Sequence, residues 1–121
     1  MSNSQSALLV LSLLARDLAV TRKFYEAVGF CLSGGAPESG WMEMKFGSAH
    51  LQFYAEAPIG TLGIPSFSGT IYLRVSNVDG IAEALKADFA FEWGPETMDY
   101  GLREFALRDP SGYLLAFSAP A

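Results

Sequence analysis

Residues 10–25 read VLSLLARDLAVTRKFY, and residues 70–85 read TIYLRVSNVDGIAEAL. In both stretches, alternating apolar residues predict a strand that ends at a favourable helix N-cap, Asp17 or Asn77. A helix is predicted after each cap. Its apolar face comprises Val20, Phe24, Ala27 and Val28 in the first copy, and Ile81, Ala84 and Leu85 in the second. The chain therefore contains a strand–helix unit twice.

The segments that follow also match each other. MEMKFGSAHLQFYA (residues 42–55) and EFALRDPSGYLLAFSA (104–119) both predict strand, turn and strand, with Leu51 and Phe53 corresponding to Leu115 and Phe117. We predict an α+β fold of two βαβββ modules, about residues 7–55 and 69–119, which form a curved mixed sheet around a concave pocket in a single domain, 1–121. The linker, 56–68, is rich in Gly, Pro and Ser. The alternative is a chance similarity between two amphipathic segments.

Composition excludes several functional classes. The chain of 121 residues has a net charge of −5 and scattered Lys and Arg, so we expect no nucleic-acid partner. The start, MSNSQSALLVLSLLARD, predicts neither a signal peptide nor a membrane span. The single cysteine, Cys31, excludes an internal disulfide, fits a cytoplasmic location, and is predicted to be a buried thiol.

Alternation in the strands predicts which side chains line a pocket. Where Leu51, Phe53, Leu115 and Phe117 pack under the helices, their neighbours face the other way. That second set is Val10, Ser12, Leu14, His50, Gln52, Tyr54, Thr70, Tyr72, Arg74, Leu114, Ala116 and Ser118. Its mixture of polar and aromatic groups is typical of a ligand cavity, and the alternative is a solvated sheet face.

The motifs FYEAVGF (residues 24–30) and RDPSGYLLAF (108–117) resemble those of the vicinal oxygen chelate superfamily, which includes glyoxalase I, extradiol dioxygenases and bleomycin-resistance proteins. The resemblance covers about Leu8 to Ala119. GWMEMKFGSAHLQFYAEAP (residues 40–58) is most similar to bleomycin-binding proteins. The resemblance implies paired βαβββ modules around a pocket that is often completed by a dimer.

The resemblance also implies four metal-ligand positions, which usually carry His, Glu or Gln, His, and Glu. In this chain they fall on Val10, Gln52, Thr70 and Ala116. Val and Ala offer no lone pair, and neutral Thr and Gln are weak ligands, so we expect no metal and no cofactor.

The remaining candidate residues favour binding over catalysis. His50 is the only histidine, and the sequence indicates no carboxylate or nucleophile paired with it, so we expect no catalytic residue. Aromatic side chains occur together with carboxylates, a combination that attracts flat or cationic ligands. The aromatic residues are Trp41, Phe46, Tyr54, Tyr72, Trp93 and Tyr100, and the acidic ones are Glu38, Glu43, Glu92, Glu96, Asp99 and Glu104. The segment 92–103 is predicted to be an irregular loop over the pocket mouth. The predicted ligand-binding residues are Trp41, His50, Gln52, Tyr54, Tyr72, Arg74, Trp93, Tyr100, Glu104 and Ala116.

Three functions remain open at this point. The first is a non-enzymatic, homodimeric small-molecule binder of the bleomycin-resistance type, which would act in antibiotic resistance. The second is a vicinal-oxygen-chelate enzyme, either a metal-free lyase or isomerase that uses His50, or a member with a degenerate or relocated metal site. The third is a structural or regulatory module with a vestigial pocket. Trp41 and Trp93 have an alternative role as core or dimer-interface anchors.

Overall fold

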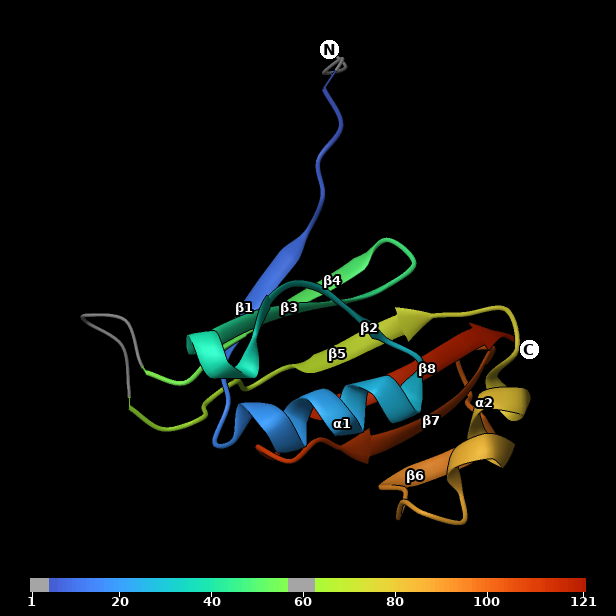
Figure 1. Ribbon diagram of the computed structural model, residues 1–121. Helices are drawn as coiled ribbons and strands as arrows, with labels where there is room; N and C mark the ends of the chain where they lie inside the picture. The colour runs from blue at the N-terminus through green and yellow to red at the C-terminus, as the bar shows by residue number, and fades with distance from the viewer. Residues whose placement is uncertain (1–4, 57–62) are drawn as a thin grey trace.

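The computed structural model describes residues 5–56 and 63–121 and contains two four-stranded sheets (Figure 1). The first sheet has the strand order β1-β4-β3-β2, and the second has the order β5-β8-β7-β6. The first module comprises β1 (Val10–Leu14), α1 (Leu18–Val28), β2 (Cys31–Ala36), a 3₁₀ turn η1 (Pro37–Ser39), β3 (Trp41–Phe46) and β4 (Ala49–Tyr54). The second comprises β5 (Thr70–Arg74), α2 (Val78–Leu85), β6 (Trp93–Thr97), β7 (Leu102–Arg108) and β8 (Leu114–Pro120).

The two modules repeat one connectivity, which confirms the α+β fold predicted from the repeat. In each sheet the first strand pairs in parallel with the last, β1 with β4 and β5 with β8, and the remaining pairs are antiparallel. Both predicted N-caps form: the Asp17 side chain accepts from the Val20 amide at 3.0 Å, and Asn77 accepts from the Gly80 amide at 2.9 Å. Each cap satisfies an amide that has no partner within its helix.

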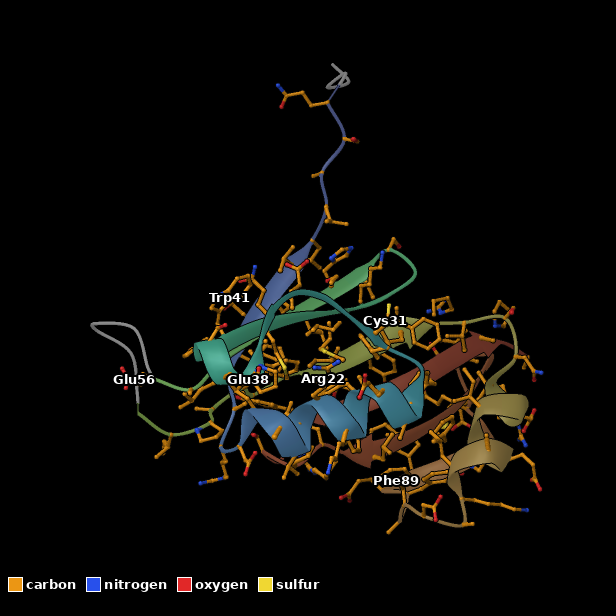
Figure 2. All side chains as sticks on the ribbon, viewed as in Figure 1. Arg22, Cys31, Glu38, Trp41, Glu56 and Phe89 are labelled. Carbon is orange, nitrogen blue, oxygen red and sulfur yellow. The ribbon has the colours of Figure 1, made fainter. Side chains whose placement is uncertain are left out.

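One hydrophobic core joins both modules. Phe24 of α1 lies edge-on to Phe89, the residue labelled beside α2 in Figure 2, with ring centroids 5.3 Å apart. Phe46 and Phe117 approach each other across the two sheets at 6.4 Å. The buried face of α1 differs from the predicted one, because it consists of Leu18, Thr21, Phe24, Tyr25 and Val28, while Val20 and Ala27 are exposed. The helix is rotated toward Tyr25 because this side chain has a buried polar partner.

That partner is Asp109, in the turn between β7 and β8. Tyr25 Oη donates to Asp109 Oδ2 at 2.8 Å, and the amides of Ser111 and Tyr113 donate to Asp109 Oδ1 at 2.8 and 2.9 Å. Tyr113 Oη in turn donates to the Leu14 carbonyl of β1 at 2.6 Å. The motif RDPSGY therefore holds the second module against the first through a buried hydrogen-bond network.

Three local predictions are corrected or left untested. The segment 92–103 is not wholly irregular, because β6 pairs with β7 despite its Gly-Pro sequence, with a register shift between Trp93 and Glu96. Cys31 is exposed rather than buried, because it begins the edge strand β2. Part of the predicted linker, 57–62, lies outside the described residues, and residues 63–69 have no regular secondary structure. Over the described ranges, no helix is long and apolar enough to cross a membrane.

Candidate functional site

The first sheet turns a row of polar and aromatic side chains away from the core. We call this set the first face. Its register places Val10 beside His50, Gln52 beside Glu43, and Trp41 beside Tyr54. The alternate residues of the same strands, including Met42, Met44, Leu51 and Phe53, are buried. The first face comprises Val10, Ser12, Trp41, Glu43, Lys45, His50, Gln52 and Tyr54.

Glu43 organises the polar part of the first face. Its Oε2 lies 3.0 Å from His50 Nδ1 and accepts from Ser33 Oγ at 3.1 Å, while its Oε1 accepts from Gln52 Nε2 at 3.0 Å. These hydrogen bonds lower the pKa of the Glu43 carboxyl from its ordinary value, and the bond with His50 has the largest effect. The expectation that His50 lacks a carboxylate partner is therefore wrong. With Nδ1 engaged by an ionised carboxylate, the other ring nitrogen, Nε2, is the one left for a ligand.

The second sheet carries a corresponding set, which we call the second face, but its central residues are buried: Ala106, Ala116 and Ser118 are 0% exposed. Along one row of the sheet Arg74 lies beside Ser118, which lies beside Glu104, and along the next row Tyr72 lies beside Ala116. Arg74 Nε donates to Ser118 Oγ at 3.0 Å. The second face comprises Thr70, Tyr72, Arg74, Trp93, Glu104, Ala106, Leu114, Ala116 and Ser118.

Glu104 is the buried charged group of the second face. Its side chain is 0% exposed, and its Oε1 accepts from Tyr100 Oη. This hydrogen bond is the main cause that raises the pKa of Tyr100, because the phenol must keep its proton in order to donate, and Tyr72 adds to the effect. Glu104 Oε2 and Trp93 Nε1 are both buried, and neither has a hydrogen-bond partner.

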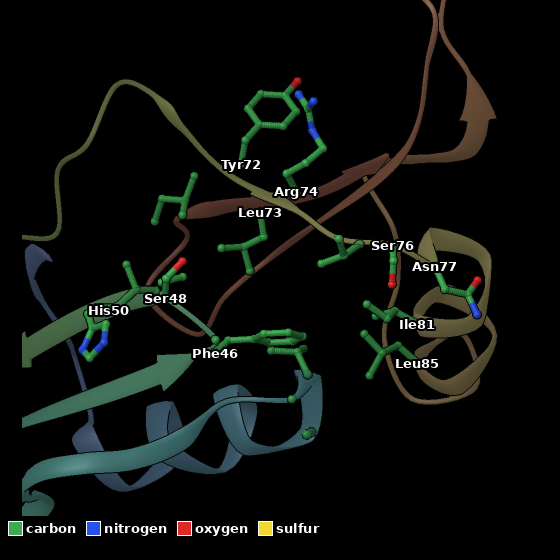
Figure 3. A pocket seen from close by; sticks show the side chains of 18 of the residues that line it. Phe46, Ser48, His50, Tyr72, Leu73, Arg74, Ser76, Asn77, Ile81 and Leu85 are labelled. Atoms are coloured by element: carbon green, nitrogen blue, oxygen red, sulfur yellow. The ribbon is translucent and has the colours of Figure 1, made fainter. Parts of the chain in front are cut away.

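A groove of about 1110 Å³ opens between the modules, on the side of β5 toward which Leu73 points (Figure 3). Apolar residues of both modules form its walls, among them Phe46, Leu73, Ile81 and Leu85. Tyr72 and Arg74 are at its rim, but their side chains point away from it (Figure 3). His50 of the first sheet and Thr70 of the second also line the groove, so it overlaps the edges of the two sets of residues that strand alternation predicts to line a pocket, while most of its lining is apolar.

The ten predicted ligand-binding residues thus divide between the two sheets. The structure places Trp41, His50, Gln52 and Tyr54 on the first face, and Tyr72, Arg74, Trp93, Tyr100, Glu104 and Ala116 on or over the second face. Sequence reasoning missed Ser33 as a partner of Glu43 and Ser118 as a partner of Arg74. The position of Glu43 beside Gln52 could have been predicted from the two-residue turn Gly47–Ser48. A turn of this length fixes the strand register and sets Lys45 opposite His50 and Glu43 opposite Gln52.

The four metal-ligand positions implied by the fold do not fit a metal ion. Val10 and Ala116 carry aliphatic side chains without a lone pair, and Gln52, whose nitrogen donates to Glu43, offers only a neutral amide oxygen. Thr70 offers only a neutral hydroxyl, which is a weak ligand, and its neighbour on β8, Leu114, is aliphatic. Across residues 5–56 and 63–121, no group of three or more His, Cys, Asp or Glu side chains is arranged to hold a metal.

The fold places the chain in the class of proteins built from two paired βαβββ modules, each with a face of polar and aromatic side chains. Residues 7–117 match the model of the Glyoxalase/Bleomycin resistance protein/Dioxygenase superfamily, and the chain belongs to this family. The family is also known as the vicinal oxygen chelate superfamily. No curated protein matches the chain.

Solved structures with the same fold include binding proteins and an enzyme. A bleomycin-binding protein complexed with bleomycin is 24% identical, with a TM-score of 0.69, over 96% of this chain and 100% of its own. A bleomycin resistance determinant encoded on the transposon Tn5 is 25% identical, with a TM-score of 0.71, over 95% and 98% of the two chains. Lactoylglutathione lyase from Agrobacterium tumefaciens is 18% identical, with a TM-score of 0.70, over 97% and 96%. The family therefore contains both binding proteins and enzymes.

Proposed function

We propose that this chain is a non-enzymatic small-molecule binding protein of the bleomycin-resistance type. The observation that carries the proposal is the chemistry of the four metal-ligand positions, where Val10, Thr70 and Ala116 replace the usual His and carboxylate ligands. A fold member without these ligands keeps the cavity-forming faces but loses the Lewis acid on which metal-dependent chemistry relies. Sequestering a toxic compound requires binding only, which is a role in antibiotic resistance.

The two faces support a planar or cationic ligand. Trp41 is 45% exposed and Tyr72 is 49% exposed, so both rings present surface for stacking. The ionised Glu43 carboxylate lies on the first face together with Trp41, and the chain has a net charge of −5. Aromatic rings beside carboxylates attract cations by charge and by cation–π contact.

A homodimer would bring the two faces together. The predicted site residues are divided between the two sheets of one chain. The N-terminal residues Leu8 and Leu9 are also exposed, as are Trp41 and Tyr72. Apolar side chains exposed in this number favour an interface, and a twofold dimer would place the first face of each copy against the second face of the other. Size-exclusion chromatography with light scattering is expected to give twice the chain mass, and a monomer at micromolar concentration would contradict this.

A thermal-shift screen against metal-free bleomycin and other planar cationic compounds tests the function. A ligand at one hundred times its Kd stabilises the folded state by about 2.7 kcal/mol. Unfolding entropy of about 2.1 cal/mol/K per residue converts this into a rise in Tm of roughly 10 °C for a chain of 121 residues. Stabilisation by at least one member of the panel is expected, and a flat response to the whole panel would contradict the proposal.

The contact between Glu43 and His50 favours a second function, a metal-free lyase or isomerase. A carboxylate on Nδ1 orients the imidazole and leaves Nε2 positioned to take a proton from a bound substrate. Metal analysis distinguishes the two enzyme hypotheses, because stoichiometric metal in the purified protein would favour an enzyme with a relocated metal site over a metal-free one. Turnover of a substrate that is lost in His50→Gln would establish the enzyme and overturn the non-enzymatic proposal.

A further inference from the structure

The buried end of the second face contains two polar atoms of opposite character that nothing in the described chain satisfies. Glu104 Oε2 is an acceptor and Trp93 Nε1 is a donor, and both are shielded from solvent without a partner. Buried polar groups in folded proteins are almost always hydrogen-bonded, and an ionisable one is the most costly to leave unmatched. Two such atoms in one region of a small domain indicate a missing partner.

The register of the second sheet places these two side chains close together. Trp93 on β6 lies opposite Ala106 on β7, and Glu104 lies two residues before Ala106, so both side chains are on the same face. Diagonal neighbours of this kind are about 7–8 Å apart at the backbone, a distance that long and aromatic side chains readily span. Gly94 lets the backbones of β6 and β7 lie close together here, because a Cβ at this position would lie only 2.8 Å from the Phe105 Cα.

Neither Arg74 nor Tyr100 supplies the missing partner of Glu104. Arg74, in the same row as Glu104, gives its Nε to Ser118, which lies between them. Tyr100 covers Glu104 and donates to the other carboxylate oxygen, Oε1. The Tyr100 side chain itself is 60% exposed on the turn before Gly101, so outward rotation of the ring would open the way to Oε2.

We propose that Glu104 and Trp93 form a recognition site for a primary carboxamide, or for an amino-heterocycle with the same adjacent donor and acceptor. An N–H of the ligand donates to Glu104 Oε2, and the neighbouring carbonyl oxygen or ring nitrogen accepts from Trp93 Nε1. Both buried atoms are then satisfied by one small group, and Tyr100, which rotates outward to admit the ligand, returns to its bond with Oε1 once the ligand is bound. This inference rests on the proposed ligand-binding function and names the chemical group by which the second face selects its ligand.

Indole NMR tests the proposal directly, because the chain has two tryptophans, one on each face. In ¹H–¹⁵N spectra, benzamide is expected to shift the Trp93 indole cross-peak in a saturable way and to leave the Trp41 cross-peak in place. Trp41→Phe assigns the two peaks. Benzoate, which has no N–H, and N,N-dimethylbenzamide, which keeps only the carbonyl, are matched probes that are expected to cause no saturable shift.

Two variants separate the contributions. Glu104→Gln replaces the free acceptor by an amide and is expected to weaken benzamide about tenfold, as the loss of one charged hydrogen bond does. Trp93→Phe removes the indole donor and is expected to weaken benzamide binding, which calorimetric titration measures because the Trp93 cross-peak is lost, while circular dichroism checks that the protein remains folded. Equal shifts with benzamide and benzoate, or unchanged affinity in both variants, would overturn the proposal. Failure of benzamide with continued stabilisation by the planar cationic panel would overturn this inference alone, whereas failure of both would also remove the proposed function.

Discussion

The hydrogen bond between Tyr25 and Asp109 provides the sharpest test of how the two modules are held together. Tyr25 is fully buried, and its Oη lies 2.8 Å from Asp109 Oδ2. Tyr25→Phe keeps the ring and removes only this donor. A hydrogen bond to a charged group contributes about 1.5–3 kcal/mol, so the free energy of unfolding is expected to fall by that amount. With about 2.1 cal/mol/K of unfolding entropy per residue over 121 residues, Tm is expected to fall by roughly 6–12 °C.

The loss should also depend on pH. Burial raises the pKa of Asp109, and the hydrogen bond from Tyr25 is the largest effect that opposes this rise. The folded state therefore holds the Asp109 proton to higher pH than the unfolded state, and this carboxyl's contribution to stability decreases as pH rises through that window. Without Tyr25 Oη the pKa of Asp109 rises further. The cost of Tyr25→Phe is therefore expected to be larger at neutral pH than below the ordinary pKa of an aspartate.

Urea unfolding at neutral and acidic pH, at one protein concentration, measures both effects. Tyr72→Phe is the matched control, because it removes a phenolic hydroxyl from a side chain that is 49% exposed, and it is expected to change the stability little. A loss below about 0.5 kcal/mol in Tyr25→Phe, within the usual range for neutral surface substitutions, would refute the role assigned to the buried network.

Two further predictions concern the two faces. Gly94 has φ of +77°, and a Cβ there would overlap the Glu104 carbonyl oxygen, so Gly94→Ala is expected to lower Tm much more than Gly47→Ala, whose φ is +58° but whose Cβ would enter open space. Equal losses in the two variants, measured by calorimetry, would contradict the close packing of β6 on β7. His50→Ala is expected to raise the pKa of Glu43 toward its ordinary value, because the hydrogen bond from His50 is the main cause that lowers it. Carboxyl ¹³C NMR measures this pKa, and an unchanged value in the variant would show that His50 does not hold Glu43.

Much of the fold was predictable because the repeat and the strand alternation are local signals. The caps Asp17 and Asn77 mark the helix starts, and the alternation around Leu51 and Leu115 assigns the buried side of each sheet. The buried side of α1 was not predictable in the same way. Val20 and Tyr25 both fit an amphipathic helix, and the choice depends on Asp109, which lies 84 residues away from Tyr25 in sequence.

The candidate site was predictable as a set of residues but not as a geometry. Alternation places Gln52 and His50 on one face, yet their common partner Glu43 follows only from the pairing of β3 with β4. β6 was missed because Gly94 and Pro95 normally interrupt a strand, and its pairing with β7 outweighs that preference. The unsatisfied atoms of Glu104 and Trp93 depend on burial, which residue types alone do not show.

Calorimetric titration of the protein with metal-free bleomycin, in the presence of a chelator, tests the central claim most directly. The proposed binding faces contain no complete set of metal ligands among the described residues, so binding is expected without any divalent ion. A twofold dimer has two equivalent sites, and the expected stoichiometry is therefore one ligand per chain. Saturable binding at that stoichiometry is the predicted result. Heat of binding that appears only after a divalent metal is added to the protein, or no binding of bleomycin or of any planar cationic compound from the thermal-shift panel, would contradict the account.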